Sequence, residues 1–103
     1  MKVLVTPRAE ADILQQHAWG EQRFGATVAG RTFNRVRRHI EVALATHPRT
    51  GKRLTVPGLY EAWIPRTPFV IFYRSDDVTD TVWVPALFHH AQDRRPFDPD
   101  DEA

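Results

Sequence analysis

A histidine and several cations in this sequence could act together on a phosphate diester. Cleavage of RNA by attack of its own 2′-hydroxyl needs a general acid or base, and positive charge around the phosphate. His89 is the candidate acid or base, with Arg74 and Lys52 as candidate cations. Four more residues could hold the phosphate, stack on a base or transfer a proton: Arg53, Arg66, Tyr60 and Tyr73. RNA cleavage is therefore one interpretation of these residue types.

Each of these candidates also has a purely structural interpretation. Arg74 follows an apolar run and could mark the point where a strand reaches water. Lys52 and Arg53 could be solvated loop charges, and His89 could cap the end of a strand. The residues alone leave both interpretations open.

Other kinds of reactive site are not indicated by the residue types. The sequence has no cysteine, and the adjacent His89 and His90 would point to opposite faces of a strand. Ser75, the only serine, falls in a predicted turn, and no glycine-rich phosphate loop is present. We therefore expect no metal site and no cofactor.

Charge is unevenly distributed along the chain. The net charge is only +1, but residues 1–55 carry +6 and residues 56–103 carry −5. Arg31, Arg35 and Arg38 share one face of a predicted helix. This face is either a solvated surface or a docking surface for an acidic partner, since arginine binds carboxylates with two parallel hydrogen bonds.

Length and composition indicate one small globular domain. The chain has 103 residues, of which 42% are hydrophobic and 26% charged, as is usual for soluble proteins. No apolar run approaches the ~18 residues of a membrane span, and the N-terminus lacks the pattern of a secretion signal. We expect a cytoplasmic protein with no membrane partner, and an acidic, flexible tail at residues 96–103.

A strand and a helical hairpin are predicted for the first half of the chain. A strand at residues 2–6 precedes a helix at 7–23, with Thr6 as its N-cap and Gly25 as its end. The residues of this helix expected to be buried are Ala9, Ile13 and Trp19. A second helix at 26–46 has an apolar stripe formed by Ala29, Phe33, Val36, Ile40, Ala43 and Leu44.

Three strands are predicted for the second half, after a loop at residues 48–58. They span residues 59–64, 69–73 and 81–88, with a hairpin turn at 75–77. The apolar run at 69–73 predicts a central strand that is covered on both faces. Pro85 predicts an edge position or a bulge, because proline cannot donate to a ladder. The last strand is expected to alternate, with Val82, Val84, Ala86 and Phe88 on one side.

These elements predict an α+β domain. An N-terminal strand is followed by a two-helix hairpin and then by a three-stranded antiparallel meander. The strands form one sheet, and the helices pack on one of its faces. Trp63 and Trp83 are expected to pack in the core or on the sheet rather than to stack on bases.

Five segments, in this order, resemble motifs of the RelE/ParE superfamily, the toxins of bacterial type II toxin–antitoxin systems often labelled plasmid stabilisation proteins. The segments are Ala-Glu-Ala-Asp-Ile at 9–13, Pro-Arg-Thr-Gly at 48–51, Pro-Gly-Leu-Tyr-Glu at 57–61, Thr-Pro-Phe-Val-Ile-Phe-Tyr-Arg at 67–74 and Phe-His-His-Ala-Gln-Asp at 88–93. The resemblance covers roughly residues 2–95, and it implies a single toxin domain at 1–95 with the fold expected above.

The resemblance implies a toxin that stops growth and is neutralised by a small antitoxin encoded in the adjacent gene. RelE-like members cut mRNA on the ribosome, and here His89, Arg74 and Lys52 would be catalytic. ParE-like members poison DNA gyrase without chemistry of their own. Target contacts would come from Arg53, Tyr60 and Arg66, and antitoxin contacts from Arg31, Arg35 and Arg38. A toxin dimer or a hetero-oligomer with the antitoxin is the expected assembly.

Three departures from the family pattern bear on the target. Tyr60 stands where the family often has arginine, and His90 stands where a glycine usually follows the first histidine. No tyrosine follows position 73. The nuclease set is therefore incomplete, and we favour a gyrase inhibitor. The alternatives are a ribosome-dependent mRNA endoribonuclease and a toxin that has lost its activity.

Overall fold

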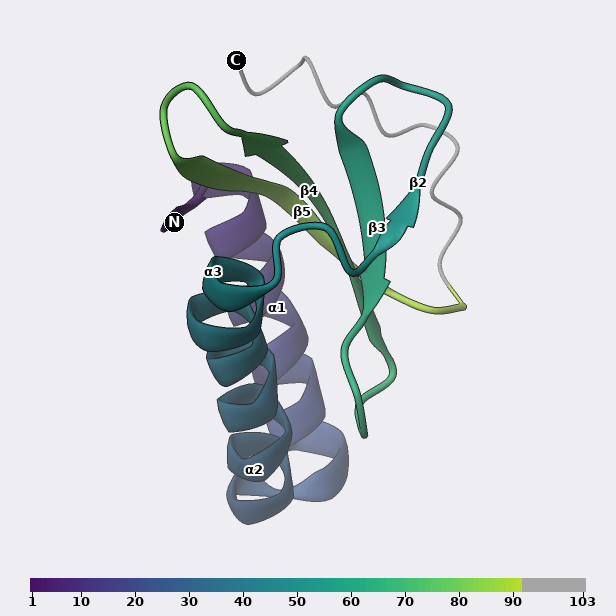
Figure 1. Ribbon diagram of the computed structural model, residues 1–103. Coiled ribbons are helices and arrows are strands. Elements are labelled where there is room, and N and C mark those ends of the chain that lie inside the picture. Colours follow the sequence, from purple (N-terminus) through teal and green to yellow (C-terminus); the bar gives the residue numbers. More distant parts are fainter. Residues whose placement is uncertain (92–103) are drawn as a thin grey trace.

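A strand, a helical hairpin and four further strands follow one another in the chain. The computed structural model describes residues 1–91. Its elements are β1 (Lys2–Val5), α1 (Pro7–Phe24), α2 (Ala26–Arg38), the π-helical turn η1 (His39–Ala43), α3 (Leu44–Thr46), β2 (Lys52–Arg53), β3 (Leu59–Trp63), β4 (Phe69–Asp76) and β5 (Thr81–His89). The helices lie together on one face of the sheet, which confirms the predicted α+β class (Figure 1).

The local signals at both ends of α1 are confirmed. The Thr6 hydroxyl accepts a hydrogen bond from the Ala9 N–H at 3.1 Å, and Pro7 is the first helical residue. Gly25 ends the helix with φ 86°, a backbone angle that favours glycine. The prediction that Trp19 is buried is wrong, because 45% of its surface is exposed and the neighbouring Gly20 is buried instead.

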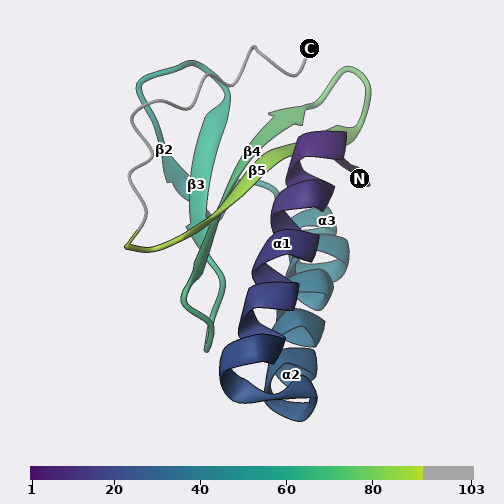
Figure 2. The same ribbon diagram turned by 180° about the vertical axis from the view of Figure 1, so that it is seen from behind.

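The second helix is continuous from α2 through η1 and α3, which matches the extent predicted at 26–46. Its apolar stripe is buried as expected at Ala29, Phe33, Val36, Ile40 and Leu44, and Ala43 is half-buried. Figure 2 shows α1 and α2 packed along each other from the side opposite to Figure 1. The π-helical turn was not predicted, because apolar spacing does not reveal it. No helix in residues 1–91 is long and apolar enough to cross a membrane.

The sheet has five strands in the order β1-β5-β4-β3-β2, with β1 parallel to β5 and the other pairs antiparallel. The fifth strand is β2, where the sequence predicted only a loop. Lys52 and Arg53 pair with Glu61 and Tyr60 of β3. Two residues are too few to show the alternation that identifies a strand.

The predicted irregularity at Pro85 is a β-bulge. Phe72 faces Ala86 and Arg74 faces Trp83, so Tyr73 lies opposite two residues of β5. A bulge moves the following side chains to the other face. Val82 and Val84 therefore share the helix side with Leu87, whereas Ala86 and Phe88 lie on the opposite side. The prediction that Val82, Val84, Ala86 and Phe88 share one face is thus wrong.

The apolar core lies mainly between the helices and the sheet. A smaller cluster on the other face contains Leu59, Phe72, Ala86 and Phe88. The first five residues of β4 are all buried, which confirms that this strand is covered on both sides. The strand continues to Asp76, so the turn is at 77–80 rather than at 75–77. Trp63 and Trp83 are exposed, so they do not pack in the core, and the alternative predicted for them, a place on the surface of the sheet, remains.

Candidate functional site

His89 lies at the end of β5, beside the helical hairpin. Its ring stacks on His90 at 4.6 Å and meets the edge of Phe69 at 5.8 Å. Burial, together with the charge of His90, holds the pKa of His89 below its usual value. The neutral form of the imidazole is therefore favoured, and this form acts as a proton acceptor.

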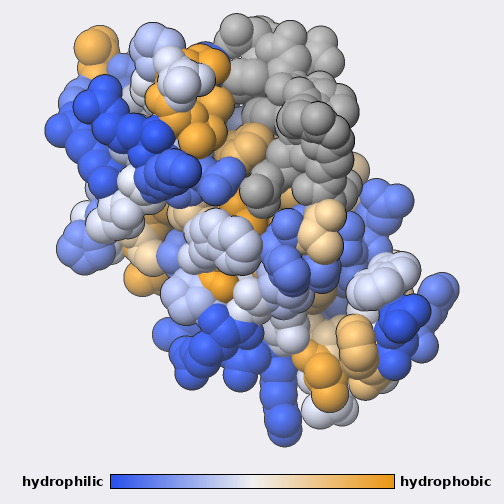
Figure 3. All heavy atoms as spheres, turned by 90° about the vertical axis from the view of Figure 1, so that its right-hand side faces the viewer, coloured by the Kyte–Doolittle hydropathy of each residue, from blue (hydrophilic) through white to orange (hydrophobic). Residues whose placement is uncertain are grey.

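An apolar groove of ≈ 410 Å³ opens next to His89. Its other walls are Trp19, Phe24 and Val28 of the hairpin, and each of these side chains is exposed. Figure 3 shows hydrophobic side chains gathered at the lower right of the face seen there, in the part of the molecule where the hairpin ends. The surroundings of His89 are thus apolar rather than cationic.

The strand register separates His89 from the predicted cations. His89 pairs with Phe69 at the start of β4, whereas Arg74 lies five residues further along the same strand. At about 3.3 Å per residue, this is a separation of roughly 17 Å. Lys52 lies on the edge strand β2, which β3 and β4 separate from β5. The sheet does not bring together the three residues that were predicted to be catalytic.

Tyr60 and Tyr73 are packed inside the domain. Their rings stack at 5.3 Å between centroids, and both are buried on the helix side of the sheet. The Tyr73 hydroxyl accepts a hydrogen bond from the Gly51 N–H at 2.8 Å. Burial raises the pKa of Tyr73, and the bond from Gly51 offsets part of this rise. Tyr73 therefore fixes the loop before β2 to the sheet, and Tyr60 supports it.

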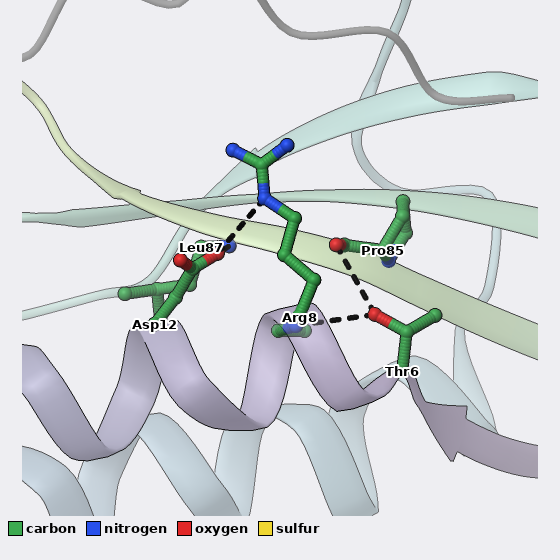
Figure 4. A network of polar contacts seen from close by, with 6 residues as sticks. Thr6, Arg8, Asp12, Pro85 and Leu87 are labelled. Atoms are coloured by element: carbon green, nitrogen blue, oxygen red, sulfur yellow. Dashed lines mark hydrogen bonds and ion pairs between the residues drawn. The ribbon is translucent and has the colours of Figure 1, made fainter. Parts of the chain in front are cut away.

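Two side chains, Thr6 before α1 and Asp12 within it, form hydrogen bonds with backbone groups at the edge of β5 (Figure 4). Strand β1 ends at Val5, opposite Val84, so the next part of β5 has no neighbouring strand on this side. The Thr6 hydroxyl donates to the Pro85 carbonyl at 3.2 Å, and Asp12 accepts from the Leu87 N–H at 3.2 Å. The sequence signal was the Ala-Glu-Ala-Asp-Ile motif, but a role for Asp12 at the sheet edge was missed.

Arg8 continues this network onto the other face of the sheet. Its Nε lies 3.7 Å from the Asp12 carboxylate, and its guanidinium lies 5.6 Å from the centre of the Phe88 ring. This pair joins the helix start to the smaller apolar cluster. Neither Arg8 nor Asp12 lines the groove beside His89.

The arginines predicted to contact partners lie on α2 and on a nearby turn. Arg35 and Arg38 line a groove of ≈ 490 Å³, and Arg66, from the turn between β3 and β4, lines the same groove. Arg31 is exposed on the same helix but does not line this groove. The structure therefore joins two of the predicted antitoxin-binding residues with one predicted target contact. Arg53, the other arginine predicted to contact the target, is exposed on β2.

Metal chemistry has no support in the described part of the chain. Residues 1–91 contain no group of three or more His, Cys, Asp or Glu side chains that could hold an ion.

Comparison with known proteins identifies the family. Residues 3–94 match the family model described as ParE toxin of the type II toxin–antitoxin system, parDE. No curated protein matches the chain.

Several solved structures share the fold. The chromosomal ParDE system of P. aeruginosa aligns with a TM-score of 0.67 at 19% identity, covering 86% of this chain and 95% of that one. The toxin–antitoxin complex RelBE2 of Mycobacterium tuberculosis aligns with a TM-score of 0.59 at 23% identity, covering 88% and 92%. The isolated E. coli RelE toxin aligns with a TM-score of 0.53 at 18% identity, covering 85% and 82%. Because the family model spans nearly the whole chain, the chain belongs to the ParE toxin family of type II toxin–antitoxin systems.

Proposed function

We propose that this toxin stops growth by binding DNA gyrase and carries out no chemistry of its own. The observation that carries the proposal is the separation of His89 from Arg74 and Lys52 across the sheet. Acid–base catalysis requires the reacting groups within hydrogen-bond reach of one substrate. The match to the ParE family model favours the same target.

The toxin is neutralised by an antitoxin encoded in the adjacent gene. The ParDE and RelBE assemblies with this fold support such a partner. Acidic residues of the antitoxin would cover the arginines on α2, namely Arg31, Arg35 and Arg38, or the sheet near Arg74. The contacts with the target would come from Arg53 and Arg66, which are exposed, whereas Tyr60 is buried and only supports Tyr73.

Ribosome-dependent cleavage of mRNA is the second candidate. The observation in its favour is that Lys52 and Arg74 lie on the same face at one end of the sheet, because their pairing partners on β3, Glu61 and Leu59, are two residues apart. Lys52 is next to Arg53 on the exposed edge strand. Such a cation group could hold an RNA backbone. In this case Arg74 and Lys52 would act without His89.

Pulse labelling in growing bacteria distinguishes the two targets. Expression of the chain is induced, and incorporation of labelled thymidine and labelled amino acid is followed over minutes. We expect DNA synthesis to stop first. If protein synthesis stops first, the gyrase proposal is wrong; if neither falls while the chain accumulates, the toxin has lost its activity.

Two substitutions separate the gyrase inhibitor from the nuclease in the same assay. His89→Ala and Arg74→Ala should each leave growth arrest intact if the chain only binds gyrase. Loss of mRNA cleavage together with loss of growth arrest in Arg74→Ala would instead support the nuclease. Glu21→Ala, an exposed change on α1, serves as the control for expression level.

A further inference from the structure

Three arginines from two distant parts of the chain line one groove between the second helix and the turn that joins β3 to β4. Arg35 and Arg38 come from α2, and Arg66 comes from the turn between β3 and β4. The groove has a volume of ≈ 490 Å³. Within residues 1–91, no carboxylate forms an ion pair with any of the three. The fold thus gathers three positive charges without neutralising them among these residues.

Two irregular backbone segments border the same groove. Arg66 has φ 61°, in the left-handed region that side chains with a Cβ rarely adopt. The π-helical turn His39–Ala43 supplies three residues of the other wall, namely His39, Val42 and Ala43. Turns of this kind occur frequently at functional sites, and strained backbone concentrates at binding surfaces. Their meeting at one groove is a second observation, independent of the charges.

The remaining lining indicates the class of ligand. The residues between the arginines are mostly aliphatic: Val42, Ala43, Ile64 and Pro65. Burial lowers the pKa of His39, so the charge of the groove comes from the three guanidinium groups. Arginine binds carboxylates through paired hydrogen bonds, and the aliphatic residues favour apolar side chains. Nucleic acid fits less well, because none of the lining residues is a Phe, Tyr or Trp on which a base could stack.

We propose that this groove binds a segment of the antitoxin that carries both acidic and aliphatic side chains, with its carboxylates on Arg35, Arg38 and Arg66. The proposal rests on the proposed function, because the partner is the antitoxin. It assigns Arg66 to the antitoxin surface, and it places the contact at the groove rather than along the whole arginine face that includes Arg31.

The test is an affinity measurement with purified proteins. The product of the adjacent reading frame is labelled with fluorescein and titrated with the full-length chain, and binding is followed by anisotropy. The variant combines Arg35→Ala and Arg38→Ala with Arg66→Asn, since asparagine tolerates the left-handed backbone at position 66. Arg23→Ala removes a positive charge from the last turn of α1, outside the groove, and is the matched control. Thermal unfolding of each variant shows that it is folded.

We expect the groove variant to bind the antitoxin at least tenfold more weakly, with a smaller dependence on NaCl concentration, and Arg23→Ala to bind within twofold of wild type. If the groove variant binds like wild type, the groove assignment is overturned while the proposed function stands. If the wild-type chain itself does not bind, both fail. The same titration with a fluorescein-labelled 20-nucleotide RNA and the matching DNA tests whether the groove binds nucleic acid instead. If the groove variant loses nucleic-acid binding but binds the antitoxin like wild type, the proposal is also overturned.

Discussion

Arg37 of α2 and Glu10 of α1 form a two-pronged ion pair, with nitrogen–oxygen distances of 2.6 and 3.1 Å. This pair joins the two arms of the helical hairpin near the end that meets the sheet. The hydrogen bonds from Arg37 hold the pKa of Glu10 below its usual value. About 40% of each side chain is exposed, so water weakens the attraction.

Arg37→Lys should lower the stability of the domain by about 0.5 kcal/mol, because an ammonium group cannot form both hydrogen bonds. The lowered pKa of Glu10 sets the pH range of the effect. The contribution is complete above the ordinary value of 4.5 and is lost as the pH falls through the folded pKa. Urea unfolding of wild type and Arg37→Lys at pH 7 and at pH 3 measures this contribution to the free energy of unfolding. An equal difference between wild type and Arg37→Lys at both pH values would contradict the assignment.

Asp12→Ala should destabilise the chain by about 1–3 kcal/mol, because the Leu87 N–H at the edge of β5 loses its acceptor. Asp12→Asn keeps an acceptor oxygen and should cost less than half as much. Equilibrium unfolding in urea compares the two variants, and Gln15→Ala, an exposed change on the same helix, is the control. If Asp12→Asn and Asp12→Ala destabilise the chain equally, the loss comes from the charge of Asp12 and the hydrogen bond from Leu87 contributes nothing measurable.

Gly51→Ala should destabilise the domain by about 1–3 kcal/mol, the usual effect of overpacking. A Cβ at this position would lie 2.6 Å from the Tyr73 hydroxyl and 2.7 Å from the Glu61 carbonyl oxygen. Adding Tyr73→Phe removes the first of these clashes but not the second, so it should restore only part of the loss. Gly30→Ala is the matched control, since nothing lies within 4 Å of its Cβ and alanine favours a helix. Gly30→Ala should therefore stabilise the domain slightly, and an equal loss in both glycine variants would contradict the prediction.

His89 should titrate below the ordinary histidine value of 6.5, because burial and the neighbouring His90 both disfavour its charged form. Because the pKa of His89 is lower in the folded chain than in the unfolded chain, protonation of His89 destabilises the fold. The contribution of the neutral form is present above pH 6.5 and is lost as the pH falls toward the folded pKa. NMR titration of the imidazole protons gives the pKa directly. His90→Ala should raise the pKa of His89 only in part, because burial is the larger cause; no rise at all would exclude a contribution from His90.

Several local features follow from the sequence because they depend on neighbouring residues alone. The cap at Thr6, the end of α1 at Gly25 and the apolar stripe of the second helix were predicted in this way. An edge position or a bulge at Pro85 was also predicted, because a missing N–H disturbs any ladder, and the structure has a bulge there. The motifs that resembled RelE/ParE toxins identified the family that the match over residues 3–94 shows.

Contacts between residues of different helices and strands could be read only from the tertiary structure. A shift of one residue at the bulge moved Ala86 and Phe88 away from the face of Val84, and apolar alternation cannot report that shift. The strand register placed His89 and Arg74 far apart, although both follow apolar runs in the sequence. Arg66 joined Arg35 and Arg38 because a hairpin turn folds back beside α2. Sequence spacing specifies contacts within one element, whereas contacts between elements depend on how the sheet and the helices pack.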